Sequence, residues 1–318
     1  MPRRTAPPHM IAAFKDNDPD MSAQHLPDVD PWNDIDVLAL VTLEQLDTLL
    51  FRNLVNQRNT NGVLYGGQVI AQAQAAAGAT VGPELRCHSL HGYFLRGGDC
   101  DRPVIYQVDK TRDGRSFSTR RVTALQNGVP ILHMECSFHT GEEGFEHQLT
   151  APAVPQPEDL PTMNELIAAE PERLGAYARY CSEKSGPIDF KLVDWRQLVE
   201  RLDEPVRRIW LRAPAAAGSD DPAVHQQILT YLSDFWLSGV AMNIHAVAVP
   251  GRFYISSLDH ALWFHRPARA DEWLLYDTES PSASSGRGLS RGSLYDRSGV
   301  LVATVMQEAL IRKARGAV

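Results

Sequence analysis

One serine of this chain stands in the pattern of a nucleophilic hydrolase serine, because residues 288–292 read Gly-Leu-Ser-Arg-Gly. In serine hydrolases this G-x-S-x-G pattern lies on a sharp turn from a strand into a helix, and an acid and a histidine follow it along the chain. Here a strand, a Ser-Gly turn and another strand are expected to follow, and no histidine occurs after His265. We therefore interpret the match as a chance occurrence in a stretch rich in glycine and serine.

The sequence contains no clear motif for binding a metal or a nucleotide. The histidine pairs His88/His91 and His260/His265 have no further ligand residues at metal-site spacing, and the four cysteines show no C-x-x-C spacing. No P-loop, G-x-G-x-x-G or H-E-x-x-H motif occurs. We expect no metal and no cofactor.

One aspartate stands at the border of a buried helix face. An acidic pair followed by Pro222 predicts a helix start. The apolar stripe that follows is Val224, Ile228, Tyr231, Leu232 and Phe235. Asp234 lies roughly 100° from the centre of this stripe on a helical wheel, where burial could raise the pKa of its carboxyl. By residue type alone, a helical aspartate is more often a solvated surface residue.

Composition limits the classes of protein. The chain has 318 residues, which fits one large domain or two of ordinary size, and 43% hydrophobic with 22% charged residues indicates a globular protein. A net charge of −8 argues against a nucleic-acid binder, and stretches such as residues 70–81 are too short to cross a membrane. Few, scattered cysteines, the absence of a secretory pattern and a C-terminus unlike a peroxisomal signal favour a cytoplasmic protein.

Prolines divide the chain. Residues 1–36 are expected to form a flexible tail, and four prolines between 152 and 161 mark a linker, with a helix expected over 163–180. Another helix is expected over the alanine-rich residues 68–80. Strands are expected over 104–109, 117–126, 131–138, 188–194, 207–212, 273–278, 288–295 and 300–309. Few helices among many strands predict an α+β protein with antiparallel sheet.

The two halves of the chain repeat each other. Tyr-Phe-Leu-Arg at 93–96 matches Trp-Phe-His-Arg at 263–266, with an offset of 170 residues. Arg120 matches Arg291, and Asn-Gly-Val at 127–129 matches Ser-Gly-Val at 298–300, with an offset of 171. The Asn-Gly dipeptide at 127–128 and the Ser-Gly dipeptide at 298–299 are both expected to form hairpin turns. Three matches in order indicate a duplicated unit.

Longer motifs carry a family resemblance. They are Leu-Tyr-Gly-Gly-Gln-Val at 64–69, His-Ser-Leu-His-Gly-Tyr-Phe-Leu-Arg-Gly-Gly-Asp at 88–99, residues 112–121, Leu-Asp-His-Ala-Leu-Trp-Phe-His-Arg-Pro at 258–267, residues 272–276 and residues 282–288. From about residue 38 to 313 the chain resembles type II acyl-CoA thioesterases, the TesB-like family. The resemblance implies a tandem, double hotdog fold: two antiparallel sheets, each wrapped around a central helix. The boundaries expected are a tail over 1–36, a first hotdog over 37–146, a linker over 147–186 and a second hotdog over 187–315.

The resemblance also implies a catalytic triad in the second hotdog. Its members are Asp234 at the end of Tyr-Leu-Ser-Asp, Ser257 before Leu-Asp-His, and Gln307 of the last strand. The bacterial prototype has threonine in place of Ser257, and serine retains the hydroxyl chemistry. A carboxylate can act as general base on water, while a hydroxyl and a carboxamide hold that water in place, so that no acyl-enzyme is needed. Taken singly, Ser257 fits an ordinary strand serine and Gln307 an edge position.

Other substrate contacts are left as alternatives. Gly66 and Gly67 could present a backbone amide to the oxyanion at a helix N-terminus, or could form only a tight turn. Arginines should contact the phosphates of coenzyme A, and the candidates, each of which could instead be a solvated surface residue, are Arg120, Arg266, Arg287 and Arg291. We expect them to gather at one entrance.

The resulting hypothesis is an acyl-CoA thioesterase that releases free fatty acid and coenzyme A, the latter being part of the substrate. One alternative is a hotdog acyl-CoA dehydratase or hydratase, for which His91 or His260 would be the catalytic histidine. Another is a non-catalytic acyl-CoA-binding module. We expect no nucleic acid and no membrane as partner, and a possible homo-oligomer, dimer or tetramer, of double-hotdog protomers.

Overall fold

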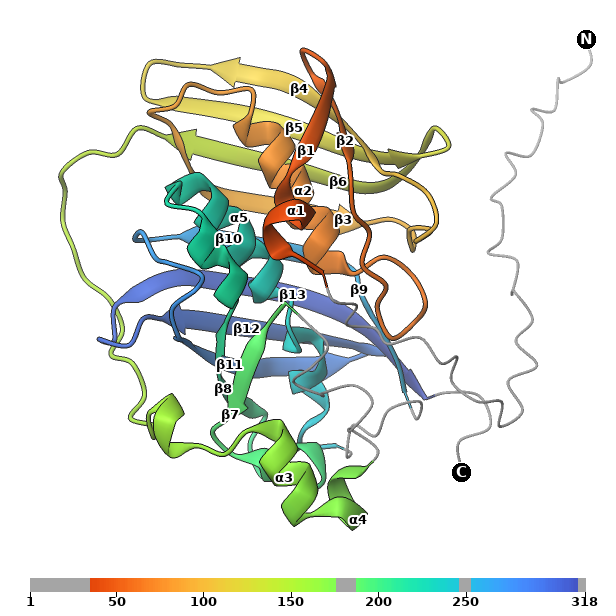
Figure 1. Ribbon diagram of the computed structural model, residues 1–318, viewed down its shortest axis with the longest axis vertical. Helices are drawn as coiled ribbons and strands as arrows, with labels where there is room; N and C mark the ends of the chain where they lie inside the picture. Colours follow the sequence, from red (N-terminus) through yellow and green to blue (C-terminus); the bar gives the residue numbers. More distant parts are fainter. Residues whose placement is uncertain (1–34, 176–186, 246–252, 314–318) are drawn as a thin grey trace, which may run out of the picture.

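The computed structural model describes residues 35–175, 187–245 and 253–313, in which thirteen strands form one antiparallel sheet (Figure 1). The helices are α1 (Val37–Val41), α2 (Gly66–Gly78), α3 (Met163–Ala169), α4 (Pro171–Leu174) and α5 (Pro222–Ser233), with 3-10 turns η1 (Pro157–Asp159), η3 (Trp195–Leu198), η4 (Pro214–Gly218) and η5 (Leu237–Met242). The strands are β1 (Leu43–Asp47), β2 (Leu50–Asn53), β3 (Arg86–Phe94), β4 (Ile105–Asp113), β5 (Phe117–Gln126), β6 (Val129–His139), β7 (Asp189–Leu192), β8 (Val206–Arg212), β9 (Phe253–Ser257), β10 (Asp259–Phe264), β11 (Leu274–Ser284), β12 (Arg287–Tyr295) and β13 (Leu301–Lys313). The expectation of an antiparallel α+β protein is confirmed.

The sheet is continuous across the two halves. The first half contributes the order β1-β2-β4-β5-β6-β3, and the second contributes β10-β13-β12-β11-β8-β7, with β9 paired to β13. Strands β3 and β10 pair with each other, so that buried Leu90 stands opposite buried Leu262. The two sets of strands expected from the sequence are therefore joined edge to edge rather than separate.

Helices α2 and α5 pack together on one face of this sheet, with α1 beside them (Figure 1). Nearly every side chain of α2 is buried, and its alanines and glycines let the two helices approach closely. Across the contact, the Thr230 hydroxyl donates to Gln74 Oε1 at 2.5 Å. Buried side chains of both halves belong to one hydrophobic core. The two halves therefore fold as one body around two adjacent helices.

The internal repeat is visible in the strands. Strands β3, β4, β5 and β6 match β10, β11, β12 and β13 in order. The guanidinium of Arg96 donates to Pro130 O at 2.8 Å, and that of Arg266 donates to Leu301 O at 3.2 Å. The same residue type thus makes the same backbone contact in each copy, at nearly the same offset.

The match of Arg120 with Arg291 is wrong, because the two side chains point to opposite faces of the sheet. Arg120 points inward with 2% of its side chain exposed, whereas Arg291 points outward with 57% exposed. At an offset of 170 the counterpart of Arg291 is Arg121, and each of these two pairs with a glutamate of a neighbouring strand, Glu279 and Glu135 respectively. Because side chains alternate across a strand, an error of one residue exchanges the two faces.

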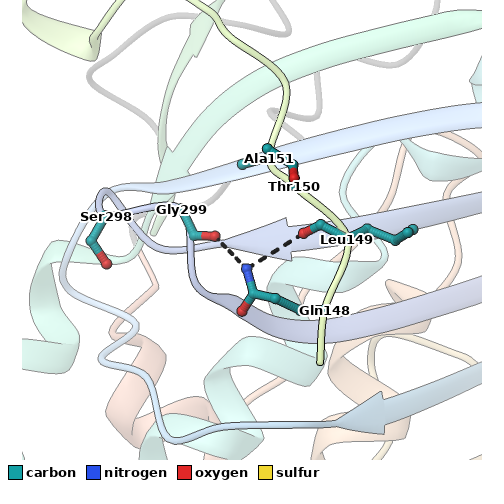
Figure 2. A pocket seen from close by; sticks show the side chains of 6 residues that line it. All are labelled: Gln148, Leu149, Thr150, Ala151, Ser298 and Gly299. Atoms are coloured by element: carbon teal, nitrogen blue, oxygen red, sulfur yellow. Dashed lines mark hydrogen bonds between the residues drawn. The ribbon is translucent and has the colours of Figure 1, made fainter. Parts of the chain in front are cut away.

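The segment between the halves runs past the β12–β13 turn. Figure 2 shows a surface pocket there, lined by Gln148, Leu149, Thr150, Ala151, Ser298 and Gly299. The Gln148 amide donates to Gly299 O at 2.8 Å and accepts from Leu301 N at 3.1 Å. The helix expected over 163–180 is two short helices, α3 and α4, and residues 176–180 lie outside the described residues, as do residues 1–34 of the expected tail. In the described part of the chain, no helix is long and apolar enough to cross a membrane.

Candidate active site

Three separate elements bring the three predicted catalytic side chains together. Asp234 caps the C-terminus of α5, Ser257 is the last residue of β9, and Gln307 lies inside β13 with its side chain fully buried. Strand β13 pairs with β9 so that Ser257 stands opposite Ala309, two residues beyond Gln307. The positions depend on strand pairing and on where α5 ends.

The Gln307 carboxamide links the other two side chains. Its Nε2 donates to Asp234 Oδ1 at 2.6 Å and to Ser257 Oγ at 2.9 Å. The second carboxylate oxygen of Asp234 accepts the backbone N–H of Gly67 at 2.7 Å. Both oxygens of Asp234 are thus held in fixed directions, one from each half of the chain.

Burial shifts the ionisation of this carboxyl. Removal from water raises the pKa of Asp234 from 3.8 to about 6, against the opposing effect of the hydrogen bonds from Gln307 and Gly67. The phenols of Tyr65, Tyr231 and Tyr276 also interact with Asp234, and burial raises the pKa of each of them above 10. Among these groups, only the carboxyl titrates near neutral pH, which suits a general base.

Two glycines allow the close approach of α2 to Asp234. A Cβ on Gly66 would lie 2.9 Å from Asp234 Oδ2, and a Cβ on Gly67 would lie 2.6 Å from the backbone oxygen of Tyr231. The N–H of Gly67 is used by Asp234, whereas no described residue accepts the N–H of Gly66. The two predicted oxyanion candidates therefore differ: the Gly67 amide holds the carboxylate, and the Gly66 amide has its donor free at the helix N-terminus.

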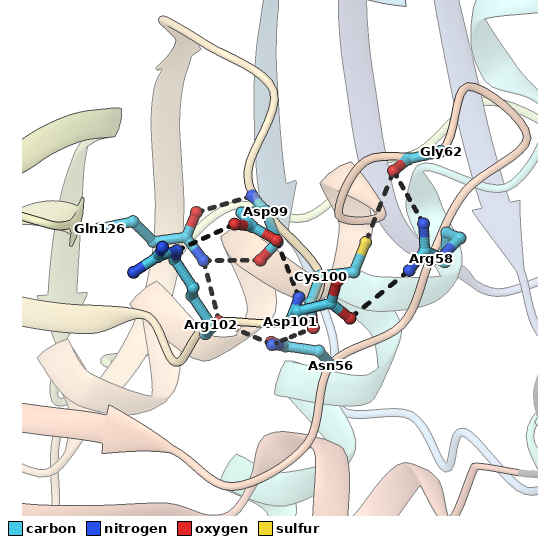
Figure 3. Close-up of polar contacts among 8 residues, drawn as sticks. All are labelled: Asn56, Arg58, Gly62, Asp99, Cys100, Asp101, Arg102 and Gln126. Atoms are coloured by element: carbon cyan, nitrogen blue, oxygen red, sulfur yellow. Dashed lines mark hydrogen bonds and ion pairs between the residues drawn. The ribbon is translucent and has the colours of Figure 1, made fainter.

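A network of side chains fixes the loop that leads into these glycines. Figure 3 shows Asn56 donating to the backbone oxygens of Cys100 at 2.9 Å and Arg102 at 2.7 Å. In the same loop, Arg58 lies 3.6 Å from an oxygen of Asp101. Further along, Asn61 donates to Ile255 O in β9 at 2.8 Å, which ties the loop to the strand carrying Ser257.

The chain turns sharply just after Asp234. Trp236 has φ of 57°, a left-handed conformation that is unfavourable for a bulky residue. Buried Arg207 donates to Trp236 O at 3.1 Å and lies 5.7 Å from the centre of the indole ring. Such strain persists only where the surroundings impose it, and it often accompanies functional sites. The surface pocket of Figure 2 contains none of the three catalytic candidates.

Family models match both halves of the chain. Residues 55–139 match the model described as acyl-CoA thioesterase N-terminal domain, and residues 151–311 match the acyl-CoA thioesterase C-terminal domain. A human protein named acyl-coenzyme A thioesterase 8 is 39% identical over 285 residues, 87% of this chain and 88% of that protein. The chain belongs to the acyl-CoA thioesterase family. It is therefore an enzyme, an acyl-CoA thioester hydrolase.

Solved structures agree with this assignment. The acyl-CoA thioesterase II TesB2 of Mycobacterium marinum is 39% identical, with a TM-score of 0.71 over 89% of this chain and 99% of its own. A protein with a hot dog fold from Alicyclobacillus acidocaldarius has a TM-score of 0.67 over 87% of this chain and 98% of its own, and at 18% identity it supports the fold alone. This chain is a type II thioesterase with the double hotdog fold, as the sequence motifs predicted.

The histidines do not fit the dehydratase alternative. His260 is buried, its Nε2 contacts Ser233 Oγ at 2.8 Å, and burial lowers the pKa of its imidazole to about 3. His91 packs at 4.9 Å edge-on against Trp263. Neither makes a hydrogen bond to a carboxylate among the described residues. Neither therefore forms the hydrogen-bonded histidine–carboxylate pair that the dehydratase alternative requires.

The four arginine candidates do not gather at one entrance. Arg120 is buried, and its guanidinium is used by Thr80 and Asp113, so the expectation of a phosphate contact is wrong for this residue. The other three lie at the surface of the thioesterase, each paired with a carboxylate: Arg266 with Glu146, Arg287 with Glu308, and Arg291 with Glu279. Motif matching found the arginines but gave no information on their burial.

The contact between Gly67 and Asp234 was missed by the sequence reasoning, which considered Gly67 only as an oxyanion donor. Its signal is the glycine pair itself, because two glycines in the first turn of a helix require a neighbour at very close range. Which neighbour that is depends on how α2 crosses α5, and nothing local in the sequence specifies it.

Proposed function

We propose that this thioesterase hydrolyses acyl-CoA by direct attack of a water molecule held among Asp234, Ser257 and Gln307. The observation that carries the proposal is the position of Gln307 Nε2, within 2.9 Å of both Asp234 Oδ1 and Ser257 Oγ. The two N–H groups of this carboxamide hold a carboxylate base and a hydroxyl side by side, which gives a water molecule a proton acceptor and an orienting donor in one place.

The steps follow from the donor and acceptor capacity of each group. The Asp234 carboxylate accepts a proton as the water oxygen bonds to the thioester carbon, and the Ser257 hydroxyl, which already accepts from Gln307, donates to that water. The tetrahedral intermediate then loses its C–S bond. Coenzyme A leaves as a thiolate and takes the proton from Asp234, which restores the base without an acyl-enzyme or a cofactor.

The negative charge on the intermediate needs a donor. We assign this role to the Gly66 amide, because it lies at the N-terminus of α2 and its neighbour Gly67 is engaged by Asp234. Helix N-termini present free N–H groups with the positive end of the dipole. The Gly67 amide instead orients the base.

The test is thiol release from a panel of acyl-CoA substrates of increasing chain length, with wild type, Asp234→Asn and the control Asp277→Asn. We expect wild type to be active and Asp234→Asn to lose about 10²–10⁴-fold in kcat. Asp277 pairs with Arg208 away from the site and should be replaceable. Wild type without activity on every chain length contradicts the function, and full activity of Asp234→Asn contradicts the role of Asp234. The panel also gives the chain-length preference.

Other parts of the hypothesis stay predictions. They are the hotdog boundaries 37–146 and 187–315, a homo-oligomer that is a dimer or tetramer, a cytoplasmic location and a place in fatty acid metabolism. Light scattering on the purified protein measures the oligomer, and cell fractionation measures the location.

A further inference from the structure

Of the buried polar atoms without a hydrogen-bond partner among the described residues, one near the candidate site is Nδ1 of His260, whose Nε2 contacts Ser233 Oγ, and two lie in the β12–β13 ladder. The latter two are Gln307 Oε1 and Ser290 Oγ, and both residues are 0% exposed. Unpaired polar groups are costly in a protein interior, so two in one place call for a physical reason. One is an acceptor only, whereas the other can donate.

Strand register places these two atoms together. In the β12–β13 ladder Ser290 stands directly opposite Gln307, and both side chains point to the helix face. Directly opposed residues have Cβ atoms about 4.5–5.5 Å apart. The inward neighbours of Ser290 along its strand are Gly288 and Gly292. The space beside them is filled by Ala241 and by the ring of Tyr276, so the pair of Ser290 and Gln307 lies in a closely packed region.

We propose that Ser290 is a positioning residue, whose hydroxyl donates to Gln307 Oε1 through one buried water and so fixes the orientation of the catalytic carboxamide. The inference rests on the proposed function. The two ends of a carboxamide have nearly the same shape, but only the nitrogen end can donate to Asp234 and Ser257. A donor on the far side favours the orientation in which oxygen faces Ser290 and nitrogen faces Asp234.

The internal repeat supports this assignment. At the offset of 170 that aligns Phe94 with Phe264, the counterpart of Ser290 is Arg120, which also points inward. Arg120 stands opposite Cys136 and is bonded to Thr80, so the first half has no carboxamide to orient at this position. The small hydroxyl occurs in the half that contains Gln307, and it is the same serine whose G-x-S-x-G context falsely indicated a nucleophile.

The experiment compares kcat, KM and the pH profile of wild type with Ser290→Ala and Ser290→Cys. A thiol is a weak donor of similar size, so kcat should fall in the order Ser, Cys, Ala, with a loss of about tenfold for alanine and little change in KM. Ser293→Ala, on the same strand but facing outward, is the matched control.

The acid limb of the profile separates positioning from simple packing. The Gln307 hydrogen bond holds down the pKa of Asp234, so a loosened carboxamide should move the limb, near pH 6 in wild type, to higher pH. The other groups that interact with Asp234 are tyrosines that titrate above pH 10. A Ser290→Ala enzyme with lowered thermal stability but unchanged kcat and acid limb would overturn the proposal.

Failure of this inference and failure of the proposed function look different. If wild type releases no thiol from any acyl-CoA, the function itself is wrong. If wild type is active, Asp234→Asn is inactive and Ser290→Ala equals wild type, only the role of Ser290 is wrong.

Discussion

Asp234 lies between the ends of two helix dipoles. As the C-cap of α5 it stands at the negative end of that helix, which opposes ionisation, while Gly67 N–H brings the positive end of α2 to one of its oxygens. Burial is the main cause that raises the pKa of the carboxyl to about 6, and the negative end of α5 acts in the same direction. At neutral pH this residue is therefore charged at a cost to the stability of the folded protein.

That cost predicts a pH-dependent stability difference between wild type and Asp234→Asn. The carboxyl binds its proton more tightly in the folded protein, with a pKa of about 6, than in the unfolded chain, with 3.8. Wild type therefore loses about 3 kcal/mol of unfolding free energy as pH rises from below 4 to above 6. The asparagine variant has no such proton, so its stability relative to wild type should increase by this amount over the same range.

Denaturant unfolding of both proteins at several pH values measures this difference. The asparagine side chain also loses or reverses hydrogen bonds, but these changes do not depend on pH. They add a constant to the stability difference between the two proteins and do not change how that difference varies with pH. A difference that stays constant from pH 4 to pH 7.5 would contradict the raised pKa.

At the scale of elements, local pattern predicted what local interactions determine. Strand β5 has the predicted bounds, and the helix expected over 68–80 is α2 over 66–78. The helix begins two residues earlier than expected, at Gly66 and Gly67, where contact with Asp234 and Tyr231 leaves no room for a Cβ. Strands β1, β2, β3, β9 and β10 were not predicted. For β3, β9 and β10 the partners lie far along the chain, whereas β1 and β2 form a local hairpin that the pattern did not reveal.

The site divides in the same way. Family motifs identified Asp234, Ser257 and Gln307, but the sequence alone gave no distances, because these depend on how β9 and β13 pair and where α5 ends. The sequence singled out Ser290 only as the serine of a chance G-x-S-x-G match. Its position opposite Gln307 depends on the register of β12 and β13, which no local pattern specifies.

Helix α2 gives a prediction that separates propensity from packing. Gly67→Ala places a Cβ 2.6 Å from the backbone oxygen of Tyr231, so it should cost about 1–3 kcal/mol and lower kcat by displacing the amide from Asp234. Gly78→Ala, at the other end of the helix, meets nothing within 4 Å and should stabilise by up to about 1 kcal/mol.

Thermal unfolding and thiol release of the two glycine variants check this pair. Both gain the same helix propensity, so a common change in stability would mean that α2 does not approach α5 as closely as described.

For the whole molecule, duplication has left two unequal copies. The position that holds Ser290 in the second half holds Arg120 in the first, with its guanidinium bonded to Thr80 just beyond the C-terminus of α2. A cation there is favourable for the helix dipole, whereas the second copy has the acidic Asp234 at the equivalent end of α5. In the first half the C-terminus of α2 is thus stabilised by a cation. In the second half the region around the C-terminus of α5 retains backbone strain and unpaired polar atoms, which are typical of a catalytic site.

The net charge of the whole chain leads to a prediction about how coenzyme A binds. A protein of net charge −8 repels the phosphates of coenzyme A at long range, so binding requires a local cation. Arg287 has the best position among the exposed candidates, because Ala309 pairs with its neighbour Gly288 on one side and with Ser257 on the other. Arg287→Glu should raise KM for acyl-CoA by about fivefold, the equivalent of about 1 kcal/mol, and leave kcat unchanged.

The control for this prediction is Arg121→Glu, which changes the net charge by the same amount on the outer face of the first half, where Arg121 pairs with Glu135. If the contact is local, KM rises only for Arg287→Glu, and the rise diminishes with added salt as the Debye length falls from about 30 Å at 0.01 M to about 8 Å at 0.15 M. Equal increases in both variants would instead mean that the whole-molecule charge governs binding and that Arg287 does not contact the phosphates.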